Sequence, residues 1–264
     1  DIHTTADKDW LDFDNAPSRA RWPVYAGESF DIWNPDSGRY YAVAEAKPLT
    51  SELEQRRAAS ATRAKGAFAS LAPETLRDPK TLPCRNARIA FRDVTRATDV
   101  RTSRSTLVPP NVFMVHTAAH LLFARGGPSA AAFVLGVMSS IPFDWMARRV
   151  VETHMTFEVL DGLPVPDSPL SAKMAKRAIG VSARLATPDD RFEEWASHFG
   201  LKPKSLDVDE KDDLICELDA AVSLLYGLDE KDVRHIFETF HVGWDFEERL
   251  RNVLRHFKRL STQR

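Results

Sequence analysis

Hydrophobic and polar positions alternate most clearly in residues 87–110, where β-branched residues, turn formers and arginines are interleaved. In an extended chain Ile89 and Phe91 point to one side and Arg88 and Arg92 to the other, because successive side chains of a strand face opposite ways. The pattern predicts a strand, a polar loop and a second strand. It also predicts that the arginine-bearing side of the first strand is exposed and that its apolar side is buried.

Other apolar patterns predict further strands and helices in the first part of the chain. Aromatic runs on either side of the turn at 34–38 predict a β-hairpin. Residues 51–72 open with a capping-box pattern and predict a basic helix that ends before Pro73. Residues 111–127 predict two short strands closed by a glycine turn, and an apolar helix and an amphipathic helix follow. Residues 153–169 are typical of a final strand with a proline-rich exit.

Helical periodicity dominates the chain beyond Pro169, where we predict a series of amphipathic helices. We therefore predict an α+β fold in which a mixed β core with packed helices, residues 21–169, precedes a helical subdomain, residues 170–264. Residues 1–20 carry charge and little apolar periodicity, so we expect an N-terminal tether there.

Composition limits the classes of protein that this chain represents. Its 36 basic and 38 acidic residues give a net charge of −2, so affinity for nucleic acid has to come from a local patch. Two cysteines, Cys84 and Cys216, favour buried thiols and a cytoplasmic location. The longest apolar run, residues 130–138, is too short to cross a bilayer, and the acidic start differs from a signal peptide, so we expect no membrane partner. Because the chain starts with Asp1 and not methionine, we expect a segment of a longer protein.

The local patch lies between Arg85 and Arg104, where six arginines and two aspartates give a net charge of +4. Guanidinium groups bind phosphate oxygens in pairs and also read guanine O6 and N7, and hydroxyl groups of nearby threonines add contacts. This pattern indicates nucleic-acid binding. A solvated strand face whose arginines pair with carboxylates elsewhere explains the same residues, and the pattern alone leaves both interpretations open.

Four segments resemble the C-terminal target-recognition domain of type IIG-like restriction-modification enzymes, which are similar to the adenine-N6 DNA methyltransferases of phage-defence systems. They are residues 88–110, 133–169, 22–42 and 217–240. The resemblance implies sequence-specific binding of double-stranded DNA by a specificity domain. The predicted groove contacts are Arg88, Arg92, Thr95, Arg96, Thr98, Arg101, Thr102 and Arg104, and Lys47, Arg148 and Arg149 are predicted to contact the DNA backbone.

Methyl transfer itself is not expected in this segment. It requires a glycine-rich cofactor loop and an Asn-Pro-Pro-aromatic motif, and Asn34-Pro35-Asp36 departs from the second motif at its third residue. The resemblance therefore assigns S-adenosylmethionine and the methyltransferase domain to another part of the parent chain. Whether this segment is itself an enzyme stays open at the level of sequence.

Two alternatives come from other classes of protein. Asp36, Glu45 and Lys47 match the loose spacing of a PD-(D/E)xK nuclease, in which two carboxylates hold Mg²⁺. A protein-interaction scaffold is the second alternative, with Leu250 and Phe257 of the last helix docking another subunit. His116 and His120 have the spacing of a zinc pair, but the glutamate of a zinc-protease motif is missing and we predict no metal site.

Overall fold

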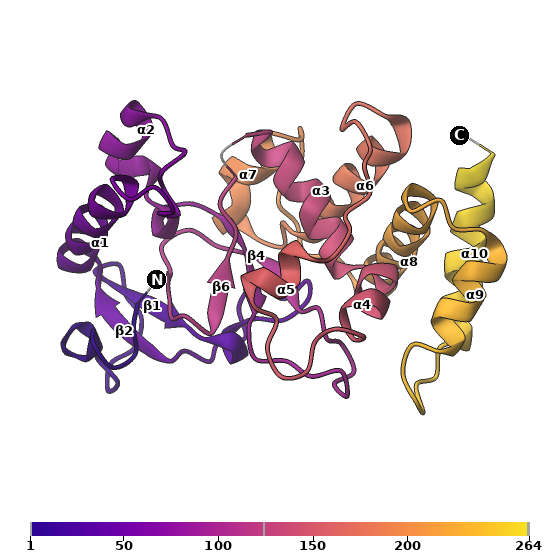
Figure 1. Ribbon diagram of the computed structural model, residues 1–264, viewed down its shortest axis with the longest axis horizontal. Coiled ribbons are helices and arrows are strands. Elements are labelled where there is room, and N and C mark those ends of the chain that lie inside the picture. Colours follow the sequence, from indigo (N-terminus) through magenta and orange to yellow (C-terminus); the bar gives the residue numbers. More distant parts are fainter. Residues whose placement is uncertain (1, 124, 263–264) are drawn as a thin grey trace.

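The computed structural model describes residues 2–123 and 125–262, and within them helices flank two small three-stranded sheets (Figure 1). The predicted α+β fold class is confirmed. The first sheet has the order β2-β1-β5 and the second has the order β4-β3-β6. The strands are β1 (Arg21–Tyr25), β2 (Ala42–Glu45), β3 (Arg88–Arg92), β4 (Ser105–Val108), β5 (Phe113–Met114) and β6 (Ala118–His120).

The first sheet contains the predicted antiparallel pair, in which β1 and β2 place Val24 opposite Ala42. The connection is longer than a tight hairpin turn, because residues 26–41 include a 3-10 turn at Gly27–Ser29. β5 adds to the other side of β1 in parallel. The N-terminal segment also joins this sheet, since Ile2 bridges to Val115 and is only 1% exposed. Bridges at Ile2 and Asp12 therefore join this stretch to the sheet, which differs from the expected tether, although most side chains between them are exposed.

The second sheet is buried on both faces. On one side of β3, Ile89 and Phe91 pack in the core that also holds helix α3 (Gly127–Ser139). On the other side, Ala90 packs with Tyr25 and Phe30, which come from the first sheet and from its connection. The strand was predicted correctly, but the prediction of an exposed arginine face is wrong, because the first sheet and its long connection cover that face.

Several helix and strand predictions need correction. Helix α1 (Ala46–Ala61) begins before Ser51 and stops well short of Pro73, and Pro73 starts the short α2 (Pro73–Arg77). Gly126, at φ +80°, caps α3 and does not close a hairpin, although the two predicted strands β5 and β6 are present. The predicted final strand is instead α5 (Phe157–Asp161), because the Thr156 hydroxyl accepts a hydrogen bond from the Val159 N–H and starts a helix.

The predicted helical C-terminal part is present, and it shares one core with the sheet region. Helices α6 and α8 pack against α3, and α10 packs on α8, so buried residues on both sides of Pro169 belong to the same hydrophobic cluster. The helices are α4 (Ile141–Ala147), α6 (Lys173–Leu185), α7 (Glu193–Ser197), α8 (Val208–Leu225), α9 (Glu230–Glu238) and α10 (Glu247–Ser261). Further 3-10 turns cover Lys8–Trp10, Pro79–Thr81, Pro83–Arg85 and Asp190–Phe192.

Burial settles two predictions about single side chains. Leu250 and Phe257 are 7% and 8% exposed in the core between α8 and α10, so the docking of another subunit through them is wrong. Cys84 and Cys216 are buried free thiols as predicted, and burial raises the pKa of both, that of Cys216 to about 12. Within the described residues no single helix is long and apolar enough to span a membrane, and the bent pair α3 and α4 alone passes by length and composition.

The cap of α9 gives a first test of this architecture. The Asp229 side chain accepts a hydrogen bond from the Asp232 N–H at 2.9 Å, and the Asp232 carboxylate accepts one from the Asp229 N–H at 3.1 Å. Replacing Asp229 with alanine leaves the Asp232 N–H without its side-chain acceptor, and we expect the free energy of unfolding to fall by about 1 kcal/mol. Urea denaturation followed by circular dichroism measures the change, and Asp229→Asn, which keeps an acceptor, should lose less.

Candidate nucleic-acid interface

The loop at residues 93–104 leaves β3 and is fastened to α4 by one buried carboxylate. Asp144, fully buried, accepts a hydrogen bond from Arg101 Nε at 2.5 Å and others from the backbone N–H groups of Thr102 and Ser103 at 3.1 Å. Arg101 also donates to the Ser139 carbonyl at 2.7 Å. The sequence analysis missed Asp144. The available signal was a single acidic residue inside an otherwise apolar helix.

Arg148 joins the same loop to the C-terminal helices. Its guanidinium donates to the carbonyls of Asp99 and Val100, each at 3.1 Å, and to the Phe240 carbonyl at 2.7 Å. It also stacks on the Phe240 ring at 4.0 Å. Burial lowers the pKa of Arg148, and the neighbouring charge of Asp144 opposes that effect. Arg148 was predicted to contact the DNA backbone. That prediction is corrected, because its guanidinium makes hydrogen bonds within the protein.

A third segment, residues 148–156, runs beside the loop. The Thr95 N–H donates to the Thr153 carbonyl at 3.2 Å, the Met155 N–H donates to the Asp93 carbonyl at 2.7 Å, and His154 Nδ1 lies 2.8 Å from the Asp93 carboxylate. We call the surface made by residues 93–104, 148–156 and 239–246 the loop ridge. Figure 1 shows these connections along the lower edge of the molecule, next to α4, α5 and α9.

The loop ridge presents two arginines to solvent. Arg96 is exposed near the tip of the first loop, where its backbone N–H is held by Asp99 at 3.1 Å. Arg149 is exposed, stacks on the Trp145 ring at 3.2 Å and donates to the Trp145 carbonyl. The other exposed side chains of the ridge include Thr98, Val94, Val100, Val150, His154 and Val242. The valines were not predicted, since their exposure depends on how the loops fold back.

The two buried threonines of the loop are structural. Thr95 Oγ1 donates to the Thr102 carbonyl at 2.9 Å, and Thr102 Oγ1 donates to the Arg96 carbonyl at 3.0 Å. The two side chains are 2% and 0% exposed. The predicted contacts of Thr95 and Thr102 with DNA are therefore corrected, because both hydroxyl groups close the loop on itself and lie away from solvent.

Three more predicted arginines are engaged inside the protein. Arg88 donates to the carbonyls of Pro83 and Val112, and its burial lowers its pKa to about 10. Arg92 donates to the Phe30 carbonyl and lies 3.4 Å from the Asp31 carboxylate, and Arg104 pairs with the same carboxylate at 2.6 Å. Arg92, Arg101 and Arg104 therefore pair with carboxylates that are distant in the sequence. This is the alternative to DNA contacts that the sequence analysis left open.

Lys47 is exposed, but the structure does not bring it to the loop ridge. It lies at the start of α1, which Figure 1 places at one end of the long axis, whereas α4 lies beyond the central sheet. Of the predicted DNA contacts, the structure keeps Arg96, Thr98 and Arg149 exposed on one surface. Their role in binding stays a prediction.

The candidate nuclease residues do not form a metal-binding site in the structure. The Asp36 carboxylate pairs with Arg191 at 2.6 Å and accepts from the Tyr40 hydroxyl at 3.1 Å. Burial raises the pKa of Asp36, but the hydrogen bonds from Arg191 and its other donors lower it overall. Glu45 is exposed at the end of β2. Across residues 2–123 and 125–262, no group of three or more His, Cys, Asp or Glu side chains is arranged to hold a metal ion.

Comparisons with known proteins give weak structural similarity and no match to a family. No protein-family model matches the chain, and no curated protein matches it. Among solved structures, the chain is similar to the Type IIL restriction-modification enzyme MmeI in complex with DNA, at a TM-score of 0.40 and 12% sequence identity. The similarity covers 93% of this chain and 31% of that enzyme, so the chain spans less than a third of its length. At this TM-score the similarity carries no argument about function.

Proposed function

We propose that this chain binds double-stranded DNA through the loop ridge and serves as the target-recognition module of a restriction-modification type adenine-specific DNA methyltransferase. The resemblance of residues 88–110 and 133–169 to target-recognition domains motivates the choice of DNA. The observation that carries the proposal is a loop fastened by buried ionic contacts that leaves Arg96 and Thr98 exposed at its tip.

The fastening of the loop suits it to recognition. Arg101 joins the loop to Asp144 of α4, and Arg148 donates to the loop carbonyl of Asp99. Little conformational entropy is therefore lost when the loop tip binds DNA. A guanidinium at the tip binds phosphate or the guanine edge, and an apolar side chain such as Val100 suits a thymine methyl group. Arg149, stacked on Trp145, is held in place for a phosphate contact.

The same structure lowers the expected strength of binding. Four of the six arginines between residues 85 and 104 are buried or paired with carboxylates, so the exposed positive charge is smaller than the sequence indicated. We therefore assign part of the DNA affinity to a methyltransferase domain in the same parent chain. That domain would use S-adenosylmethionine, and the whole protein would work in the cytoplasm.

Replacing Arg96 and Arg149 together with alanine should weaken the binding of a random-sequence DNA duplex. Each lost phosphate contact should reduce the slope of log affinity against log salt by about 0.9, because fewer counterions are released. Fluorescence anisotropy across a salt titration without metal measures both the affinity and the slope. Neither side chain fastens the loop to α4, so the fold should be unaffected.

The matched control is Arg63→Ala, which removes an exposed arginine just after α1. This variant should keep the affinity and the salt slope of the parent chain. If the double variant also keeps both, the loop ridge is not the DNA-binding surface.

A further inference from the structure

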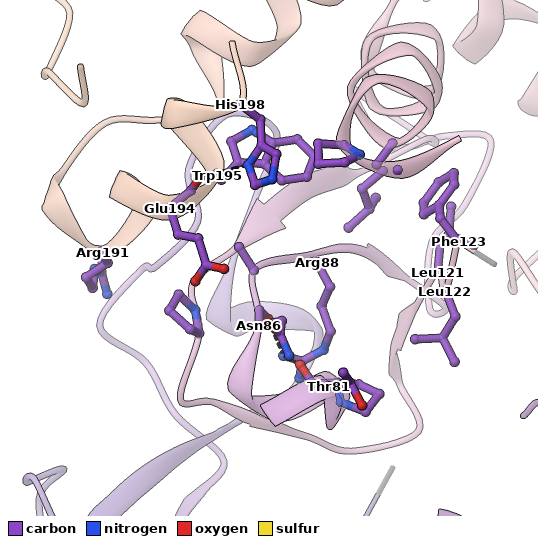
Figure 2. A pocket seen from close by; sticks show the side chains of 17 residues that line it. Thr81, Asn86, Arg88, Leu121, Leu122, Phe123, Arg191, Glu194, Trp195 and His198 are labelled. Atoms are coloured by element: carbon purple, nitrogen blue, oxygen red, sulfur yellow. Dashed lines mark hydrogen bonds between the residues drawn. The ribbon is translucent and has the colours of Figure 1, made fainter. Parts of the chain in front are cut away.

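A pocket of about 380 Å³ lies between β3, residues 121–123, the start of α3 and α7, away from the loop ridge (Figure 2). Its volume falls in the range of small-molecule sites. Most of its wall is apolar, formed by side chains such as Ile89, Pro110, Leu121 and Ala131. No residue of the loop ridge lines it, so the DNA-binding proposal leaves this pocket unexplained.

The first polar group at the pocket is the cation of Arg88. This side chain is 7% exposed, and within the described residues no carboxylate forms an ion pair with it. Among the described residues its terminal nitrogens donate to backbone carbonyls alone, and its Nε has no hydrogen-bond partner. A buried cation without a counter-charge is costly, so this wall of the pocket favours a ligand with hydrogen-bond acceptors.

The second polar group is the carboxylate of Glu194. Glu194 is exposed on α7, and in Figure 2 its side chain extends toward the part of the pocket that carries Asn86 and Arg88. In the part of the chain that the structure describes, this carboxylate has no hydrogen bond or ion pair. It is an acceptor available to a ligand that carries N–H donors.

Aromatic rings complete the pocket. Figure 2 shows Trp195 and Phe123 on different sides of it, so flat apolar surfaces flank the space between the two polar groups. Trp195 is 8% exposed and lies beside Phe199, with ring centroids 5.5 Å apart and the rings tilted by 52°. Among the described residues its Nε1 has no hydrogen-bond partner. The pocket therefore combines flat apolar walls with donors on one side and a carboxylate on the other.

We propose that this pocket binds a guanine base. Guanine presents two acceptors, O6 and N7, along one edge, and two donors, N1–H and the 2-amino group, along the next. The acceptors suit Arg88 and the donors suit Glu194, while the aromatic walls suit the ring faces. Adenine places an amino group beside N7 and has no proton at N1, so it offers a donor to Arg88 and an acceptor to Glu194.

Calorimetric titration of the whole chain with GMP tests the proposal directly. We expect saturable binding of one GMP, with AMP weaker by about tenfold or more, the factor that one well-made pair of hydrogen bonds provides. Inosine monophosphate lacks the 2-amino group and should fall between the two. Glu194→Gln should weaken GMP by about tenfold and remove the difference between GMP and inosine monophosphate.

Glu193→Gln is the matched control, because Glu193 is also exposed at the start of α7 but does not line the pocket. It should bind GMP like the parent chain. The proposal is overturned if GMP does not bind at millimolar concentration, if AMP binds equally well, or if Glu194→Gln behaves like the control. Glu194 is exposed, so loss of the fold does not confuse the result.

A competition experiment identifies the source of the guanine. If a thymine oligonucleotide with a single guanine displaces GMP, the site takes a base from nucleic acid, and if GMP binds without such displacement, the site takes a free nucleotide. The Arg96→Ala, Arg149→Ala double variant should bind GMP normally in either case. Failure of the guanine proposal is thereby separate from failure of the DNA-binding proposal.

Discussion

Replacing Asp144 with alanine is expected to lower the free energy of unfolding by about 3–5 kcal/mol, because the change leaves buried charges without a partner. The carboxylate is fully buried, and it accepts hydrogen bonds from Arg101 and from the N–H groups of Thr102 and Ser103. Arg148 lies 3.9 Å from it. Without Asp144, the Arg101 guanidinium has to leave the interior or remain there unneutralised.

The same variant should also loosen the loop ridge. Arg101 and Asp144 join the loop at 93–104 to α4, so their separation frees Arg96 to sample more conformations. We therefore expect weaker DNA binding in the variant even under conditions where it is folded, since ordering the loop then costs entropy on binding. Hydrogen exchange of the loop amides would detect this change independently of DNA.

Urea denaturation followed by tryptophan fluorescence measures the loss of stability. Glu210→Ala is the matched control, because Glu210 also pairs with a cation, Lys204, but its side chain is 39% exposed and that of Lys204 is 65% exposed. Such an exposed pair contributes less than about 1 kcal/mol. A loss at Asp144 as small as the loss at Glu210 would mean that water replaces the buried carboxylate, and that the loop does not depend on it.

The sequence predicted the elements whose periodicity is local. The apolar face of α10, with Leu250, Val253 and Phe257, follows from helical spacing, and it is buried. The strands β3 and β4 follow from period-two alternation and turn residues, and they pair antiparallel. In these segments neighbouring residues determine both the element and the side that faces the core.

The sequence did not predict what covers each side of an element. Alternation placed Arg88 and Arg92 on the side of β3 opposite Ile89 and Phe91, but Tyr25 of β1 and Phe30 of the connection that follows it cover that side. Likewise, Thr156 makes a short helix where strand-forming residues predicted a strand. The first difference arises from packing against the other sheet and the second from one side-chain hydrogen bond, and local propensity contains neither.

The candidate site shows the same limit in its charges. Six nearby arginines were read as an exposed patch, yet Arg104 pairs with Asp31 and Arg101 pairs with Asp144, partners that are distant in the chain. A charge pattern in the sequence gives the number of charges and not their partners. Arg96 remained exposed because it lies at the tip of the loop, beyond the reach of the core.

A second buried carboxylate, Asp219 in α8, is expected to be about as important for stability as Asp144. It is 1% exposed, accepts a hydrogen bond from the Ile141 N–H at the start of α4, and pairs with Arg249 of α10 at 2.7 Å. It thus joins three helices. Asp219→Ala leaves both donors unsatisfied, and we expect the free energy of unfolding to fall by about 3–5 kcal/mol.

Substitutions at both ends of the pair separate the two contributions of Asp219. Asp219→Asn keeps an acceptor for the Ile141 N–H and should recover part of the loss, whereas Arg249→Met removes the partner charge and should destabilise by itself. In a double-mutant cycle of Asp219→Ala with Arg249→Met, a coupling of about 1–3 kcal/mol would confirm that the ion pair stabilises the fold. A coupling near zero would contradict it and would mean that Arg249, which is 27% exposed, is solvated without its partner. Because α4 also carries Asp144, a real coupling would make the junction of α8 and α10 a determinant of the geometry of the loop ridge.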